Sequence, residues 1–130
     1  MSTLKVTTIQ DISGNNSSTA EQIQQGRNKV WCRMTNSGGT PAIADSFNVS
    51  SLTDHAAGDF GFNFTNNLPN ANYAAVATSE VASSNISVAQ LVIGGNRVSD
   101  VRFQFFQIQN LSGGGVTVDP PVVAMICCGD

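Results

Sequence analysis

The sequence predicts an all-β protein: an antiparallel β-sandwich or jelly-roll-like domain, with a short N-terminal arm and at most one short helix. Three observations lead to this. Apolar and polar residues alternate with period two through most of the chain. Turn residues recur about every ten residues, which is the spacing of a sandwich. Helix signals are confined to one short segment. The length of 130 residues is sufficient for one buried core.

The beginning of the chain is expected to form an arm that serves attachment or trimerisation. We assign residues 1–26 to this arm and residues 27–130 to the β-sandwich domain. Leu4 and Val6 share one face of a first strand. The stretch 13–19 is rich in Asn and Ser and separates this strand from the rest, so the start of the chain is free to dock elsewhere.

One short helix is expected from Ala20 to Gln25. Thr19 precedes it as an N-cap, and Gln22 stands at the position that completes a capping box. Gly26 follows and is expected to stop the helix. The segment therefore predicts one or two helical turns.

Strand alternation is clear in two segments of the domain. In residues 30–34 the Val, Cys and Met positions share one face, and Trp31 and Arg33 share the other. In residues 60–64 three phenylalanines alternate with small or polar residues. A run at residues 47–49 is expected to pair with this second segment, with residues 53–59 as the hairpin loop.

The longest of the later strands changes its apolar phase near its end. Val101, Phe103 and Phe105 occupy one face, and then Phe106 and Ile108 take the opposite phase. This pattern indicates either a β-bulge or a strand buried on both faces. The later strands are expected at residues 73–78, 86–93, 98–108 and 122–128.

The final strand is apolar on both faces. Residues 122–128 contain no polar residue other than cysteine, and Pro120 and Pro121 before them require a turn or an edge break. One face of this strand is expected to pack on the core. The other meets either a neighbouring subunit or loops of the same chain.

The charge content argues against several classes of function. Only 12% of the residues are charged, whereas an ordinary domain is about one quarter charged. The net charge is −3, and the six Lys and Arg form no basic stripe, so we expect no nucleic-acid partner. No apolar run is long enough for membrane insertion, and the first residues lack the apolar core of a secretion signal.

The chain contains a single histidine, His55, which is its main candidate for a catalytic or metal-binding residue. His55 is close in sequence to Ser50, Ser51 and Asp54, but ordinary loop composition explains this group. With Asp59, these residues match no known pattern of metal ligands. We therefore expect no catalytic, cofactor-binding or metal-binding residue, and a protein that is not an enzyme.

The remaining chemical features also favour structural roles. Three cysteines without CxxC spacing predict buried free thiols and neither disulfides nor zinc. The glycines at 94–95 and 113–115 lack the sequence of a phosphate-binding loop and are expected in turns. Trp31 and Tyr73 are able to stack on sugars, but aromatic residues of a small sandwich more often form its core.

Segments distributed along the chain share a recognisable pattern. They are Leu4–Asn15, Ser18–Ile23, Gln25–Arg27, Asp45–Asp54, Gly58–Phe60, Asn63–Thr65, Leu68–Tyr73 and the C-terminal strand that ends in Gly129–Asp130. These segments resemble small virion proteins and tail-fibre modules of tailed phages, especially marine and cyanobacterial phages. The resemblance covers most of the chain, but residues 28–44 and 79–100 depart from it. Asn28-Lys29-Val30-Trp31-Cys32 stands where family members usually have an Ala-Trp run.

The resemblance implies a virion structural protein, made in the bacterial cytoplasm and assembled as a homotrimer on a tail fibre or another appendage. Residues 1–12 would attach to the particle, and the domain would face a host surface or a neighbouring virion protein. The family supplies no catalytic residue. The expected partners are further copies of the chain, other tail or capsid proteins, and a host surface glycan. A capsid decoration protein and a free carbohydrate-binding module remain alternatives.

Overall fold

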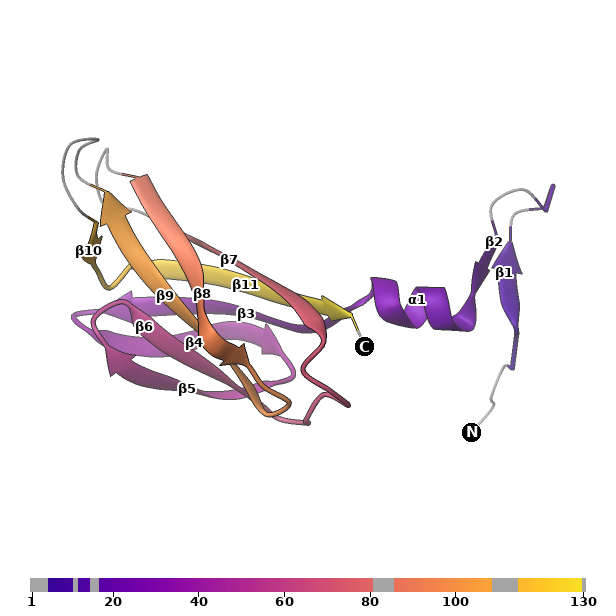
Figure 1. Cartoon of the computed structure of the whole chain (residues 1–130), viewed down its shortest axis with the longest axis horizontal. Coiled ribbons are helices and arrows are strands. Elements are labelled where there is room, and N and C mark those ends of the chain that lie inside the picture. Colours follow the sequence, from indigo (N-terminus) through magenta and orange to yellow (C-terminus); the bar gives the residue numbers. More distant parts are fainter. Residues whose placement is uncertain (1–4, 11, 15–16, 81–85, 109–114, 130) are drawn as a thin grey trace.

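The computed structural model describes residues 5–10, 12–14, 17–80, 86–108 and 115–129. These residues form an all-β protein with one helix in the part that is described (Figure 1). The expected all-β class is confirmed. The elements are β1 (Thr8–Gln10), β2 (Ser17–Thr19), α1 (Ala20–Gly26), β3 (Asn28–Ser37), β4 (Thr40–Phe47), β5 (Val49–Ala56), β6 (Asp59–Phe64), β7 (Tyr73–Ser79), β8 (Ile86–Asn96), β9 (Asp100–Ile108), β10 (Val116–Thr117) and β11 (Val122–Gly129).

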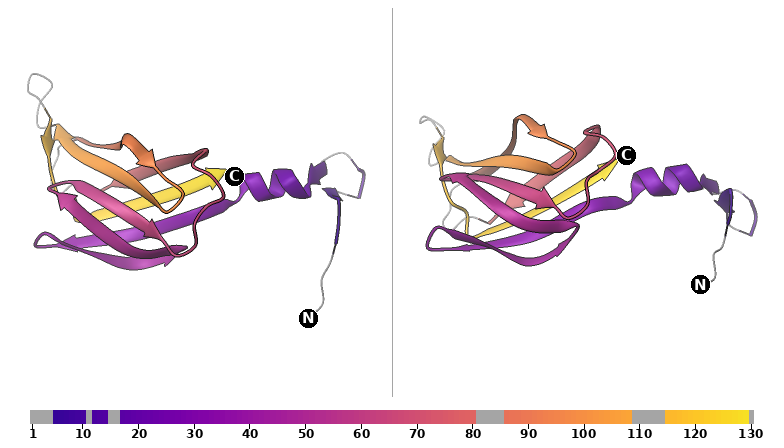
Figure 2. Two further views of the ribbon diagram at one scale, coloured as in Figure 1. Left: turned by 60° about the horizontal axis from the view of Figure 1, so that its bottom comes forward. Right: turned by 90° about the horizontal axis from the view of Figure 1, so that it is seen from below.

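Two antiparallel sheets face one another as the layers of a sandwich (Figure 2). Sheet I has the strand order β4-β3-β11-β7. Sheet II has the order β10-β9-β6-β5, and β8 pairs with the other edge of β9. The first strand of the sandwich, β3, pairs with the last, β11, so the two ends of the domain lie in the centre of one sheet.

The core is built from the period-two faces of the central strands. Phe60, Phe62 and Phe105 are fully buried in sheet II. The ring of Phe60 is tilted against that of Phe105, and the ring of Phe62 meets that of Phe103 edge-on. Such ring pairs add to the free energy gained by burying apolar area. The buried core residues are Val30, Cys32, Met34, Val49, Phe60, Phe62, Phe64, Leu68, Tyr73, Val101, Phe103, Phe105, Val123, Met125 and Cys127.

The arm consists of the hairpin β1–β2 and helix α1, and it extends away from one end of the sandwich (Figures 1 and 2). The capping box is confirmed: the amide of Thr19 donates to Oε1 of Gln22 at 2.9 Å, and the amide of Gln22 donates to Oγ1 of Thr19 at 3.1 Å. Gly26 is the last helical residue, and Arg27 continues in extended conformation. The helix thus ends without a left-handed glycine, because the chain runs directly on into β3.

The hairpin between β5 and β6 is tighter than its sequence predicted. Ala56 pairs with Asp59, so the turn is Ala57–Gly58 and not the whole stretch 53–59. Gly58 has φ +70°, and a Cβ there would lie 2.6 Å from the carbonyl oxygen of Val118. Its amide donates to the Asp119 carboxylate at 2.6 Å. Glycine is therefore required at this turn for both conformation and space.

Of the two explanations expected for Phe105 and Phe106, a β-bulge is absent at this point. The pairing of β9 with β8 is unbroken from Leu91↔Phe103 to Ile86↔Ile108. The other explanation, a strand buried on both faces, holds in part, because Phe105 is buried on the inner face and Phe106 is half-buried on the outer face. The irregular position lies on β8 between Leu91 and Asn96, where the glycines at 94–95 belong to the strand and not to a turn.

Other expectations at the ends of elements have mixed outcomes. Pro120 and Pro121 precede β11 and lie in no strand, as expected. The N-terminal strand begins at Thr8 and not near Val6, and Leu4 lies outside the described residues. The glycines 113 and 114 also lie outside them. In the described part of the chain, no helix has the length and apolar character to cross a membrane.

Candidate functional site

The two serines and the aspartate that precede His55 in the sequence all lie with it on strand β5. Asp54 and His55 are therefore not in a loop, contrary to expectation. The hydroxyl of Ser50 donates to the carbonyl of Asn63 at 3.2 Å, and the hydroxyl of Ser51 accepts from its side-chain amide at 3.0 Å. Among the residues that the structure describes, no hydrogen bond joins these serines to His55. Asn63 instead connects β6 to β5.

Asp59 forms a structural ion pair. Asp59 is 6% exposed, and its carboxylate accepts hydrogen bonds from Nε and Nη2 of Arg102, both at 2.7 Å. These bonds from Arg102, with smaller contributions from the charges of Arg102 and His55, lower the pKa of Asp59 against the opposing effect of burial. The described residues contain no group of three potential ligands that would hold a metal ion.

The cysteines divide into two core thiols and one that is partly accessible. Burial raises the pKa of Cys32 to about 11 and that of Cys127 to about 12. Cys128 is half-buried. All three are free, so the expected free thiols are confirmed, although Cys128 is less buried than predicted.

The two aromatic residues singled out from the sequence have different positions. Tyr73 is 5% exposed, and its hydroxyl lies 3.0 Å from the carbonyl oxygen of Arg97 and 3.1 Å from that of Asp100. Burial raises the pKa of Tyr73 to about 12. Trp31, by contrast, faces away from the core on β3 and is half-buried. The core position expected of both residues holds for Tyr73 and is wrong for Trp31.

Trp31 belongs to an apolar row that crosses the outer face of sheet I. Phe47 of β4 is opposite Trp31, which is opposite Ile126 of β11. Ile126 is in turn opposite Val76 of β7, so the row spans all four strands. Phe47 is 55% exposed and Val76 57% exposed. Apolar area of this extent on an outer face is typical of an interaction surface.

The four residues of this row are visible in the sequence, but the sequence does not predict that they lie next to one another. Each strand contributes one residue to the row, and a single apolar residue on the outer face of a strand is ordinary. Only the register of β3, β4, β7 and β11 brings them into one line. A depression of about 160 Å³ lies at the end of this row, between residues 76–78 of β7 and residues 124–126 of β11.

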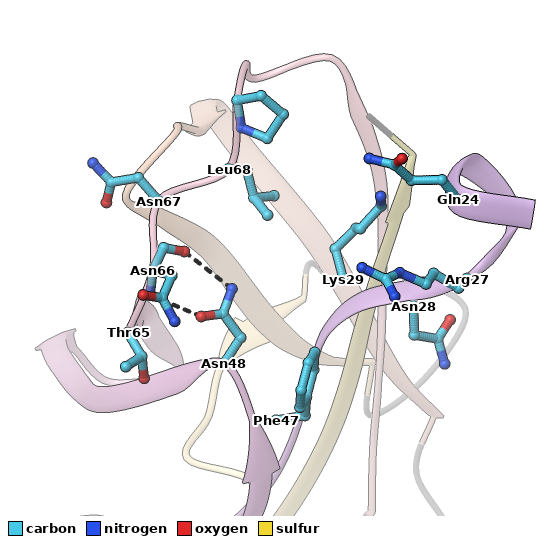
Figure 3. A pocket seen from close by; sticks show the side chains of 11 residues that line it. Gln24, Arg27, Asn28, Lys29, Phe47, Asn48, Thr65, Asn66, Asn67 and Leu68 are labelled. Atoms are coloured by element: carbon cyan, nitrogen blue, oxygen red, sulfur yellow. Dashed lines mark hydrogen bonds between the residues drawn. The ribbon is translucent and has the colours of Figure 1, made fainter. Parts of the chain in front are cut away.

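A groove of about 410 Å³, the junction groove, lies where the arm meets the sandwich (Figure 3). Its wall is held by Asn48, whose side chain donates to the Asn66 carbonyl at 3.0 Å and accepts from the Asn66 amide at 2.8 Å. Arg27 and Lys29 supply positive charge, and the described residues that line the groove include no carboxylate. The lining residues are Gln24, Arg27, Asn28, Lys29, Phe47, Asn48, Thr65, Asn66, Asn67, Leu68 and Pro69.

The arm exposes apolar side chains that it does not bury itself. Ile9 is 56% exposed, Ile12 is fully exposed and Ile23 is 41% exposed. No residue of α1 is buried. A hairpin of such short strands and a helix of seven residues are marginal in water without tertiary contacts. These exposed side chains therefore contribute little to the stability of the arm in the single chain.

Comparison with known proteins found no matching family model, and no curated protein or solved structure with significant similarity to this chain.

Proposed function

We propose that this chain is a structural protein of a phage virion, a tail-fibre-like or tail-appendage protein that assembles as a homotrimer. The observation that supports this most strongly is the arm. Ile9, Ile12 and Ile23 are exposed, and none of the arm residues that the structure describes is buried. Such a segment gains stability when another chain covers it. The proposed role of the arm is to hold three copies together and to attach them to the particle.

The low charge of the chain supports an assembled state. Fifteen residues carry a full charge, nine of them acidic and six basic. Copies related by a three-fold axis place identical side chains near one another, and like charges at such an axis are costly to desolvate. Asn, Ser, Thr and Gly in the turns keep the surface polar without this repulsion.

The assembly is tested by native mass spectrometry of the full chain. We expect a trimer or a multiple of it, and a smaller assembly when Ile9→Asn and Ile23→Asn remove the apolar contacts of the arm. Ile93→Asn is the matched control, since Ile93 is 99% exposed on β8 of the sandwich. A wild-type chain that stays monomeric at micromolar concentration would contradict the proposal.

The place on the virion is tested separately. Antibody labelling of purified particles is expected to mark the tail or its appendages. A capsid decoration protein is the alternative, because the same arm would serve equally to anchor a sandwich on a shell. Label spread over the shell, with a copy number near that of the shell subunits, would favour this alternative.

Carbohydrate binding is a second candidate function, and the junction groove favours it. Phe47 offers an aromatic face, while Asn48 and Asn67 offer amide groups of the kind that hydrogen-bond to sugars. Host-surface recognition by a tail appendage would use such a groove. A glycan array with the full chain tests this, and Phe47→Ala is expected to abolish any binding that Ile93→Ala retains. If no glycan binds, the groove has no part in recognition.

A further inference from the structure

We propose that β7 pairs with β7 of a second copy of this chain, antiparallel, about a two-fold axis at Val76. Sheet I of the two copies would then form one continuous sheet. The outer edge of β7 is then a contact surface between two copies. Only the biological role of this contact rests on the proposed function. The contact itself depends on the edge of β7, and it is separate from the arm.

The edges of the two sheets differ in how they are protected. Natural sheets use charges, prolines and irregular pairing to prevent contact between edges. At the edge strand β4, the register shifts between Arg33 and Met34 of its partner, and the strand contains Pro41 and Asp45. The edge strand β5 has two register shifts and contains Asp54.

Strand β8 also has a shifted register, between its Leu91 and Asn96. Strand β7 has none of these features. It pairs with β11 in seven consecutive positions without a shift, and its sequence Tyr-Ala-Ala-Val-Ala-Thr-Ser contains neither a charge nor a proline. Among the described residues, no strand pairs with its outer edge.

The hydrogen bonds between β7 and β11 show which backbone groups of β7 point to the open edge and are available to pair with a second copy. The amide of Glu80 donates to the carbonyl of Val122 on β11 at 2.9 Å. Because the direction alternates along a strand, the groups of Val76 and Thr78 also point to β11, and those of Ala75 and Ala77 point to the open edge. Asn96 confirms this phase, since its side-chain amide donates at 3.0 Å to the carbonyl of Tyr73, which has the same parity.

The axis at Val76 matches this phase. It places Ala75 opposite Ala77 of the second copy, and both residues point their backbone groups toward the contact, so the pair closes two hydrogen bonds. Val76 is the middle residue of the strand and faces itself across the axis. Pairing about this axis involves the stretch from Ala74 to Thr78, because the Tyr73 carbonyl at one end of β7 already accepts from the side chain of Asn96.

The side chains are compatible with self-pairing. The residue types that meet are Val with Val, Ala with Ala and Ala with Thr, apart from the two ends of the strand, so no like charges are opposed. On the outer face, the apolar row that ends at Val76 continues into the row of the second copy. An isologous contact of this kind is self-complementary by symmetry.

Disulfide trapping of the full chain tests the register. Val76→Cys is expected to form a covalent dimer under mild oxidation, because directly opposed residues of a non-hydrogen-bonded pair have Cα atoms about 4.5 Å apart, within reach of a disulfide. Thr78→Cys is the matched control: its residue would be opposite Ala74, about 13 Å along the strand from its own copy. The wild-type chain controls for Cys128. No dimer from Val76→Cys, or equal dimer from both variants, would overturn the proposal.

Charge substitutions test the contact without covalent trapping. We expect Val76→Lys and Val76→Glu each to halve the mass of the native assembly, and a mixture of the two to restore it, since opposite charges then face one another at the axis. Val88→Lys, on β8 of the other sheet, is expected to change nothing. An unchanged mass for Val76→Lys, with a circular dichroism spectrum like that of the wild type, would refute the contact. Ile9→Asn separates the two proposals, because it weakens the arm and leaves the Val76→Cys cross-link intact.

Discussion

Replacing Asp59 by Asn tests whether the ion pair with Arg102 stabilises the sandwich through charge. Asp59 is 6% exposed, and its carboxylate accepts two hydrogen bonds at 2.7 Å. An Asn has nearly the same shape, but it has one acceptor oxygen and presents an NH₂ group to a donor of Arg102. A hydrogen bond to a charged group contributes about 1.5–3 kcal/mol. We therefore expect Asp59→Asn to lower the free energy of unfolding by about 2 kcal/mol at pH 7.

The same substitution has a defined pH dependence. The pKa of Asp59 is lowered in the folded state, so its contribution is fully present above the ordinary carboxyl pKa of about 3.9 and is lost as pH falls through the folded value. Asn does not titrate. The difference between the wild type and Asp59→Asn is therefore expected to be constant from neutral pH to about pH 5 and to shrink below pH 4.

Urea unfolding at one fixed protein concentration measures both effects, with circular dichroism as the signal. Asp100→Asn is the control, because the ion pair of Asp100 with Arg97 is longer, at 3.4 Å, and Arg97 is 54% exposed. An exposed pair of this kind contributes about 0–1 kcal/mol. Equal stability of Asp59→Asn and the wild type at pH 7 would refute the reasoning. A difference that persists unchanged at pH 3 would also refute the attribution to charge.

Three further predictions concern single positions. Tyr73→Phe removes the hydroxyl that lies between two backbone carbonyls, and we expect the free energy of unfolding to fall by about 1 kcal/mol in urea. Gly58→Ala is expected to lower the melting temperature more than Gly38→Ala, because both have positive φ but only Gly58 has backbone within 3 Å of a new Cβ; equal losses would contradict this. At pH 8 a thiol reagent is expected to modify Cys128 first and the two core thiols only after unfolding, as their raised pKa and burial require.

The sequence predicted the strands where one face meets the core. Residues 30–34 and 60–64 place apolar residues at every second position because one face of each strand is covered by the core, and the structure confirms that these positions are buried. The turn at Ala57–Gly58 was less predictable. Polar residues such as Asp54 occur in loops and on exposed edge strands alike, so composition did not reveal that β5 extends through them.

The positions of apolar residues on the outer faces of the sheets were the features that the sequence predicted least well. The outward Phe106 produces the same sequence pattern as a β-bulge, and the outward Trp31 has the residue type expected in a core. A pattern of residue types does not show which face of a strand is covered. The apolar row required the register of four strands and is therefore a property of the tertiary structure. The capping box of α1 was predictable because its contacts span three residues of one segment.

The low charge, the apolar row and the exposed arm together favour an assembled state. A monomer normally keeps its apolar surface small and relies on charge for solubility. On the outer face of sheet I, Arg33 is opposite Asp45, so the two charges beside the row offset one another and give the face little field of its own. Electrostatic repulsion between two such faces is therefore small. The exposed apolar residues, which would be a liability in an isolated chain, are then contacts that assembly completes.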